Sequence, residues 1–89
     1  MEQFLCPVDV ISVFRADGEI QPLRLQLNGS DQMKFRVDIE EVLSVKDIPY
    51  TGAEAHIFLC RARSGGKHMT LELKYTIRSH SWWLLRRLS

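Results

Sequence analysis

Residues 56–77 read H-I-F-L-C-R-A-R-S-G-G-K-H-M-T-L-E-L-K-Y-T-I, two alternating apolar and polar runs separated by Gly65-Gly66. Adjacent glycines supply the positive φ values that a tight hairpin turn requires. Because side chains alternate between the faces of a strand, the turn determines which residues share a face. The expected buried face holds Ala62 with Met69, Cys60 with Leu71, Phe58 with Leu73, and His56 with Tyr75. The expected outer face holds Arg63 with His68, Arg61 with Thr70, Leu59 with Glu72, and Ile57 with Lys74.

A second turn is predicted at Asp17-Gly18, a dipeptide typical of two-residue hairpins. With this turn at the centre, the buried face holds Val8 with Leu27, Val10 with Leu25, Ser12 with Leu23, and Phe14 with Gln21. The expected solvent-facing side holds Asp9 with Gln26, Ile11 with Arg24, Val13 with Pro22, and Arg15 with Ile20. A slip of one residue would exchange the two faces, so the pairing is a specific prediction.

The remaining alternation extends the two hairpins into a meander. Strands are expected at 6–15, 19–27, 33–39, 41–47, 55–63, 68–77 and 82–87. The third and fourth could also form one long, bent strand. The apolar residues on each side of the second connection can share a face only if it has odd length. Gly29-Ser30-Asp31 with a bulge would satisfy that requirement. Residues 48–54 contain proline and glycine and are expected to form a loop.

Residues 33–46 fit two secondary structures. Phe35, Ile39, Val42 and Leu43 match a helical stripe that Asp31 could cap. Several residues of the stretch are β-branched, however, and residues 33–39 alternate well. We favour a strand that is kinked near Glu40-Glu41, where the alternation changes phase.

The predicted fold is therefore all-β: an antiparallel meander of about six to seven strands forming a strongly bent sheet or a small, partly open barrel. At 89 residues, we expect positions 1–89 to form a single domain. The net charge of +1 produces no strong field for polyanions. Two cysteines are too few for a disulfide scaffold, so we expect reduced thiols and a cytoplasmic location. We expect neither a secretion signal nor a membrane span.

Trp82 and Trp83 are adjacent, so in a strand they point to opposite faces. With Ser79-His80 at the last turn, Trp82 pairs with Ile77 and Leu84 with Tyr75 on the buried face. Trp83 then lies outside, on what we call the predicted contact face. This face consists of Trp83, Leu85, Ile57, Leu59, Arg61, Arg63, Lys74 and Arg87.

Three readings fit the predicted contact face. The 48–54 loop or barrel closure could cover Trp83. Alternatively, the face binds a protein partner or a second copy of the chain, because tryptophan and arginine are enriched at interface centres. The third reading is a small β-barrel that binds single-stranded nucleic acid, with bases stacked on Trp83 beside Arg61, Arg63, Arg86 and Arg87. The near-zero net charge disfavours nucleic acid. We therefore predict a module that binds a protein partner or associates with itself, in the second case as a homodimer.

The chain offers little for catalysis or metal binding. His56 and Cys60 share a face but lie four strand residues apart, about 13 Å, too far for a common zinc ion. His68 is expected on the other side of the sheet, and Cys60 inside the core. Asp38, Glu40 and Glu41 are typical of a solvated strand edge. We predict no metal, no cofactor and no enzymatic activity.

One resemblance covers most of the chain. The segment F-R-A-D-G-E-I-Q-P-L from Phe14, the segment I-E-E-V-L-S-V from Ile39, and the late Trp82-Trp83 resemble a family of small uncharacterised bacterial proteins of the Firmicutes type. That family carries an F-x-x-D-G-x-I-x-P-L opening. The end of this chain departs from it at residues 84–87, L-L-R-R. The resemblance implies a bacterial cytosolic origin and no known activity.

Overall fold

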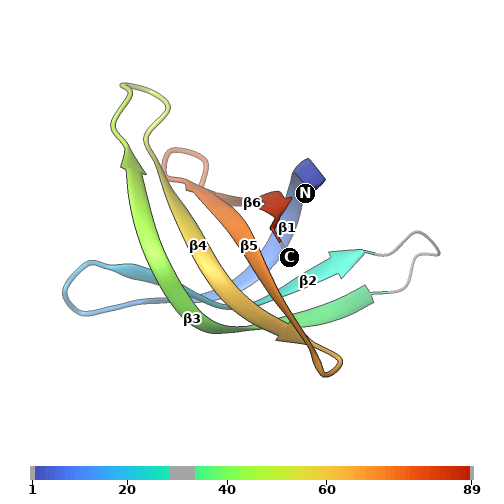
Figure 1. Ribbon diagram of the computed structural model, residues 1–89. Coiled ribbons are helices and arrows are strands. Elements are labelled where there is room, and N and C mark those ends of the chain that lie inside the picture. Colours follow the sequence, from blue (N-terminus) through green and yellow to red (C-terminus); the bar gives the residue numbers. More distant parts are fainter. Residues whose placement is uncertain (1, 29–33, 89) are drawn as a thin grey trace.

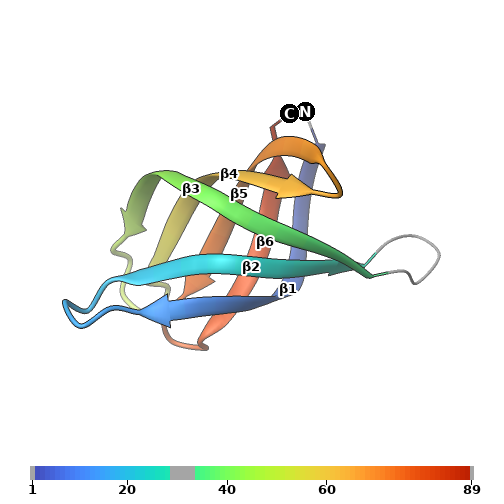
Figure 2. The ribbon, with the colours of Figure 1, turned by 90° about the horizontal axis from the view of Figure 1, so that it is seen from below.

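The computed structural model describes residues 2–28 and 34–88, and the side chains of 6–27 and 34–88 (Figure 1). The described part of the chain forms six strands: β1 (Glu2–Phe14), β2 (Ile20–Asn28), β3 (Lys34–Ile48), β4 (Ala55–Ser64), β5 (Lys67–Thr76) and β6 (Ser81–Arg87). Each strand pairs antiparallel with the next, and β6 pairs back with β1 to close a barrel (Figures 1 and 2). The prediction of an all-β antiparallel meander is confirmed.

The β4–β5 hairpin forms as predicted, with every expected pair in register from Ala55 opposite Thr76 to Ser64 opposite Lys67. Gly65 and Gly66 have φ values of 58° and 84°, which residues other than glycine rarely adopt. The predicted buried face lies inside the barrel, where Cys60 is fully enclosed. The glycine pair therefore sets both the turn and the interior of this half.

The β1–β2 hairpin corrects the expected turn. Asp9 opposite Gln26, Val10 opposite Leu25 and Ile11 opposite Arg24 are confirmed. At the tip, however, the Arg15 amide donates to the Glu19 carbonyl at 2.7 Å, and the Gly18 amide donates to the Arg15 carbonyl at 2.9 Å. The turn therefore contains three residues, with Gly18 last at a φ of 91°. This is the three-residue type, a type I turn followed by a left-handed glycine.

The longer turn changes which β2 side chains enter the barrel. Near the tip Ser12 lies opposite Pro22, Val13 opposite Gln21 and Phe14 opposite Ile20, and a bulge at Leu23 restores the predicted register beyond it. The expectations that placed Gln21 and Leu23 inside and Ile20 and Pro22 outside are wrong. Ile20 is 8% exposed, whereas Leu23 is 43% exposed.

Strand β3 is continuous, so the helical alternative for residues 33–46 is wrong. Its register shifts between Ile39 and Glu41, which confirms the predicted kink, and again between Val42 and Ser44. The first half pairs with β2, from Asn28 opposite Lys34, and the second half pairs with β4 (Figure 1). An odd number of residues joins β2 to β3, as predicted; the proposed turn Gly29-Ser30-Asp31 and Met33 lie outside the described residues.

Strand β6 has the predicted facing but a different register. Tyr75 lies opposite Trp82 and Leu73 opposite Leu84, so both expected pairs of β6 are wrong. The turn spans residues 77–80, and His80 has a φ of 53°. The pairing differs from the expected one by an even number of positions. The predicted interior placement of Trp82 and Leu84 is therefore confirmed, while Ile77 lies exposed in the turn.

The core fills the barrel and is held by aromatic and branched side chains. The centroid of the Trp82 ring lies 5.5 Å from the ring centroid of Phe58 and 5.0 Å from that of Tyr75. The buried cluster consists of Ile20, Leu25, Val37, Phe58, Cys60, Ala62, Met69, Leu71, Leu73, Tyr75, Trp82 and Leu84. The 49–54 loop meets the 77–80 turn, where the Ile77 amide donates to the Glu54 carbonyl at 3.0 Å.

Candidate functional site

The structure brings the centre of the predicted contact face together. Ile57, Lys74 and Trp83 occupy one row across β4, β5 and β6, and Pro7 of β1 continues it. Leu59 and Arg61 follow on the same side of β4. The apolar members Ile57, Leu59, Trp83 and Leu85 are all half-buried.

Arg87 lies elsewhere. A register shift near Leu73 leaves Leu85 out of the β5–β6 pairing, so Arg86 lies opposite Glu72 and Arg87 opposite Leu71. Since Leu71 is an interior residue, the shift turns Arg87 towards the end of the lumen. The expected outer-face position of Arg87 is corrected.

Glutamates pair with Arg61 and Arg63 of the predicted contact face and with Arg86, which lies beside that face on β6. Arg61 forms an ion pair with Glu41, and Arg63 lies 3.9 Å from Glu40. Arg86 binds both carboxylate oxygens of Glu72, at 2.7 and 3.2 Å. The hydrogen bonds that Arg86 donates to Glu72, together with the negative charge of that carboxylate, raise the pKa of the Arg86 guanidinium. The cross-strand pairs alternate positive and negative groups, so this face carries no uninterrupted basic stripe.

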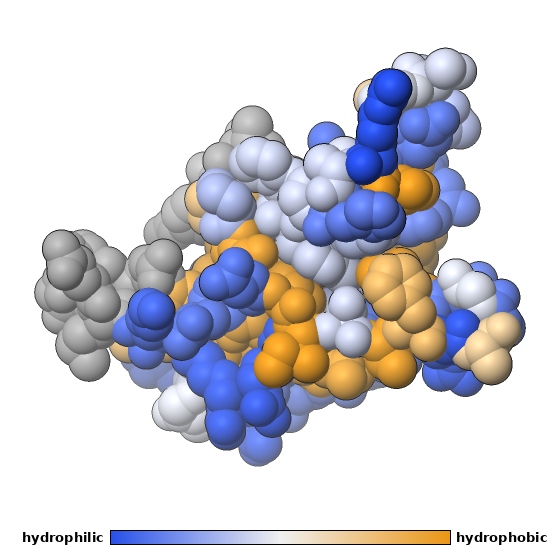
Figure 3. Space-filling view, turned by 180° about the vertical axis from the view of Figure 1, so that it is seen from behind, coloured by the Kyte–Doolittle hydropathy of each residue, from blue (hydrophilic) through white to orange (hydrophobic). Residues whose placement is uncertain are grey.

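A more exposed apolar surface lies on β1 and β2. Ile11 is 59% exposed and Val13 39%, both on the outer side of β1. Leu23 joins them because the bulge leaves it outside between the buried residues Pro22 and Leu25. We call Ile11, Val13 and Leu23 the first-hairpin patch. Figure 3 shows hydrophobic residues gathered over this part of the molecule, and Figures 1 and 2 show the hairpin extending past the other strands.

Sequence reasoning missed the first-hairpin patch, although one signal was present. Residues 10–14, V-I-S-V-F, carry apolar side chains on both faces of one strand. One face of such a strand fills the core, and the other stays exposed unless something covers it. Ile11 and Val13 are the exposed members here.

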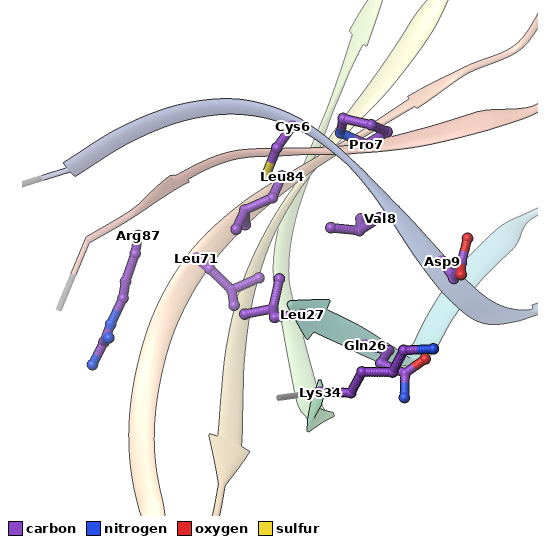
Figure 4. Close-up of a pocket in the computed structure, with 10 residues that line it drawn as sticks. All are labelled: Cys6, Pro7, Val8, Asp9, Gln26, Leu27, Lys34, Leu71, Leu84 and Arg87. Atoms are coloured by element: carbon purple, nitrogen blue, oxygen red, sulfur yellow. The ribbon is translucent and has the colours of Figure 1, made fainter. Parts of the chain in front are cut away.

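One end of the barrel lumen opens into a cavity of about 520 Å³ (Figure 4). Its apolar lining converges from β1, β2, β5 and β6 and consists of Cys6, Val8, Leu27, Leu71 and Leu84. In Figure 4 Arg87 stands on one side of this space, and Gln26 and Lys34 on the other. Pro7 and Asp9 complete the lining.

The other barrel end carries a small polar cluster. The His56 Nδ1 lies 2.7 Å from an Asp47 carboxylate oxygen, and the Tyr75 hydroxyl lies 2.8 Å from the His80 Nδ1. The His56 and Tyr75 rings are parallel, with centroids 6.4 Å apart. These contacts satisfy the polar groups at the rim and tie the 77–80 turn to β5.

Neither cysteine is in a disulfide, and Cys60 is chemically protected. Burial raises the pKa of the Cys60 thiol to about 12, so at neutral pH it is the unreactive thiol and not the thiolate. Within residues 2–28 and 34–88, no group of three or more His, Cys, Asp or Glu side chains could hold a metal ion. Over the same ranges, no helix is long and apolar enough to cross a membrane.

Comparison with known proteins gives no relative: no family model, no curated protein and no solved structure matches this chain. Function must therefore be inferred from the surfaces and the cavity of the molecule.

Proposed function

We propose that this chain is a non-enzymatic protein-interaction module that self-associates through the first-hairpin patch. The observation that carries the proposal is the exposure of Ile11, Val13 and Leu23 at neighbouring positions of one sheet face. Contiguous apolar surface on a folded protein usually marks a contact with something else. The bacterial cytoplasm is the proposed location, in keeping with the free thiols of Cys6 and Cys60.

Charge supports a second copy of the chain as the partner. The net charge of +1 gives two copies almost no long-range repulsion. Charges of both signs lie near the patch: Arg24 with Asp38 at 2.9 Å, and Arg15 with Asp17 at 3.8 Å. A two-fold symmetric dimer places the same patch of both copies face to face. An apolar centre with charges of both signs at its rim can pair in this way without bringing only like charges together.

Sedimentation over a concentration series tests the proposal. Wild-type protein is expected to shift from monomer to dimer, and Ile11→Ser to weaken the association. Burying a whole isoleucine contributes about 1.5–3 kcal/mol, and more than half of Ile11 is still exposed. Both copies contribute in a symmetric dimer, so the loss is about 2–4 kcal/mol, roughly 30-fold or more in affinity.

Trp83→Ala is the matched control, because it removes an apolar side chain from the predicted contact face instead. This variant is expected to dimerise like the wild type. A wild-type protein that stays monomeric at every concentration contradicts the proposal. An effect of Trp83→Ala but not of Ile11→Ser would move the interface to the predicted contact face.

No structural observation favours the alternative, binding of single-stranded nucleic acid. That reading placed Arg61, Arg63, Arg86 and Arg87 beside Trp83, and the first three each face a glutamate, which leaves less positive charge for phosphates. We therefore expect a random single-stranded oligonucleotide to leave tryptophan fluorescence unchanged at low and at moderate salt. Salt-sensitive quenching would support the alternative.

A further inference from the structure

The second half of β3 has one edge that no neighbouring strand covers. β2 pairs with β3 only as far as Arg24 opposite Asp38, and beyond that point β3 pairs with β4 alone. Figures 1 and 2 both show this half of β3 bending away from β2. Of the strands in the described part of the chain, none pairs with the free edge of residues 41–46, which we call the β3 edge. An exposed strand edge is a template on which another strand can add.

The exposure of an inward-facing valine shows that the barrel wall is open beside the β3 edge. Val45 lies opposite the core residue Phe58 and therefore faces the interior, yet it is 50% exposed. Both residues, with Ile20 of β2, are among those that line a cavity of about 110 Å³. Ligand pockets usually measure about 300 Å³ or more. The opening therefore suits an added strand that covers Val45 better than it suits a small molecule.

The two faces of the β3 edge differ in character. Val42 and Val45 each lie opposite a buried residue of β4, whereas Glu41, Ser44 and Lys46 lie opposite residues of the outer face. Opposite residues of an antiparallel pair share a face, so the valines point inwards and the other three outwards. The segment therefore carries an acid at one end of its outer face and a base at the other, at equal distances from its middle.

Both charged side chains can reach a partner. The Glu41 side chain is 51% exposed, and although it pairs with Arg61, a carboxylate has acceptor capacity for more than one donor. Lys46 is exposed, and no acidic side chain among residues 6–27 and 34–88 pairs with it. A strand that adds here is therefore favoured if it brings a base to Glu41 and an acid to Lys46.

We infer that the β3 edge pairs antiparallel with the β3 edge of a second copy, about a two-fold axis at the middle of residues 41–46. In this register Val42 lies opposite Val45 and Glu41 opposite Lys46, and symmetry makes each pair occur twice. Every opposed pair then shares a face. A shift of one residue would place inward valines opposite outward polar residues. The segment is thus its own complement in both apolarity and charge.

This pairing goes beyond self-association through the first-hairpin patch and does not depend on it, because the two surfaces use different residues. A contact of six residues on each copy is small, and small interfaces are weak, so we expect it only at high protein concentration. Where both interfaces form, pairing at the β3 edge joins first-hairpin dimers into larger assemblies.

Amide proton–nitrogen correlation NMR of Ile11→Ser up to millimolar concentration tests the inference with the first-hairpin patch weakened. The amides of residues 41–46 should shift with concentration, whereas those of Gly65 and Gly66, at the β4–β5 turn, should stay constant. Constant amides at residues 41–46 overturn the inference. The wild type reports on the other interface through the amides of Ile11, Val13 and Leu23, so either interface can fail while the other stands.

Charge reversal in the Ile11→Ser background tests the register. Glu41→Lys and Lys46→Glu each place like charges opposite one another in both symmetric pairs, and each should weaken the pairing by about tenfold. A mixture of the two variants restores opposite charges in both pairs, so the labelled variant should shift with its unlabelled partner as strongly as the parent does alone.

The control mixture replaces Lys46→Glu with Lys67→Glu, which makes the same change of net charge at the β4–β5 turn. Lys67→Glu alone should pair like the parent, and its mixture with Glu41→Lys should not regain the parent's full shift. A mixture of Glu41→Lys and Lys46→Glu that pairs no better than either variant alone, or no better than the control mixture, overturns the proposed pairing of Glu41 with Lys46.

Discussion

Raising the pH is expected to destabilise the barrel through Cys60. Its side chain is fully buried, and its pKa in the folded protein is about 12, against 9.0 for an ordinary thiol. Between these two pH values the unfolded chain loses the thiol proton and the folded chain keeps it. The free energy of unfolding should therefore be unaffected below about pH 9 and fall by about 1.4 kcal/mol per pH unit above it. At about pH 10.5 the loss is about 2 kcal/mol.

Urea unfolding of wild type and Cys60→Val at about pH 8 and pH 10.5 measures this loss. Valine fills a similar volume and carries no titrating group, so the other ionisations, including that of Cys6, are common to both proteins and cancel. The wild type should lose about 2 kcal/mol more than the variant between the two pH values. Equal losses would refute the reasoning, because they would mean that the thiol of Cys60 ionises as readily in the folded barrel as in the unfolded chain.

Four further outcomes follow from the described contacts. A thiol reagent should modify Cys6 but not Cys60 in the folded protein and both in urea, as read by mass spectrometry. Phe58→Ala should lower the free energy of unfolding by about 3–5 kcal/mol, because the residue is fully buried against Trp82, and a loss below about 1 kcal/mol would place it outside the core. Gly66→Ala should cost about 1–2 kcal/mol, since its φ of 84° strains any side chain. Ile11→Ser should change monomer stability by no more than about 0.5 kcal/mol, so its effect on association is not an effect on folding.

The two hairpins show why one register could be predicted fully and the other only in part. Two adjacent glycines admit a two-residue turn, and the β4–β5 pairing followed without error. Asp17-Gly18 serves equally in a two-residue turn and as the end of a three-residue turn. The second occurs here, and the bulge at Leu23 that compensates for it has no distinctive sequence signal.

The candidate surfaces depended on those local irregularities. The alternation of side chains between the two faces was enough to place Trp82 inside and Trp83 outside. A shift of the register by an even number of residues does not change this facing. The bulges at Leu23 and Leu85 each add one unpaired residue to a strand and so reverse the alternation of faces. They put Leu23 on the outer surface and turn Arg87 towards the end of the lumen. Alternation of apolar and polar residues alone therefore could not predict the first-hairpin patch or the position of Arg87.

Amide proton–nitrogen correlation NMR over a dilution series is the most direct measurement of self-association through the first-hairpin patch. Its reporters are the amides of Ile11, Val13 and Leu23 on one side, and the indole of Trp83 on the other. The three amides should shift together with concentration and follow a dimer isotherm, while the indole stays constant. A spectrum that does not change with concentration, or one that changes only around Trp83, would contradict the proposed interface.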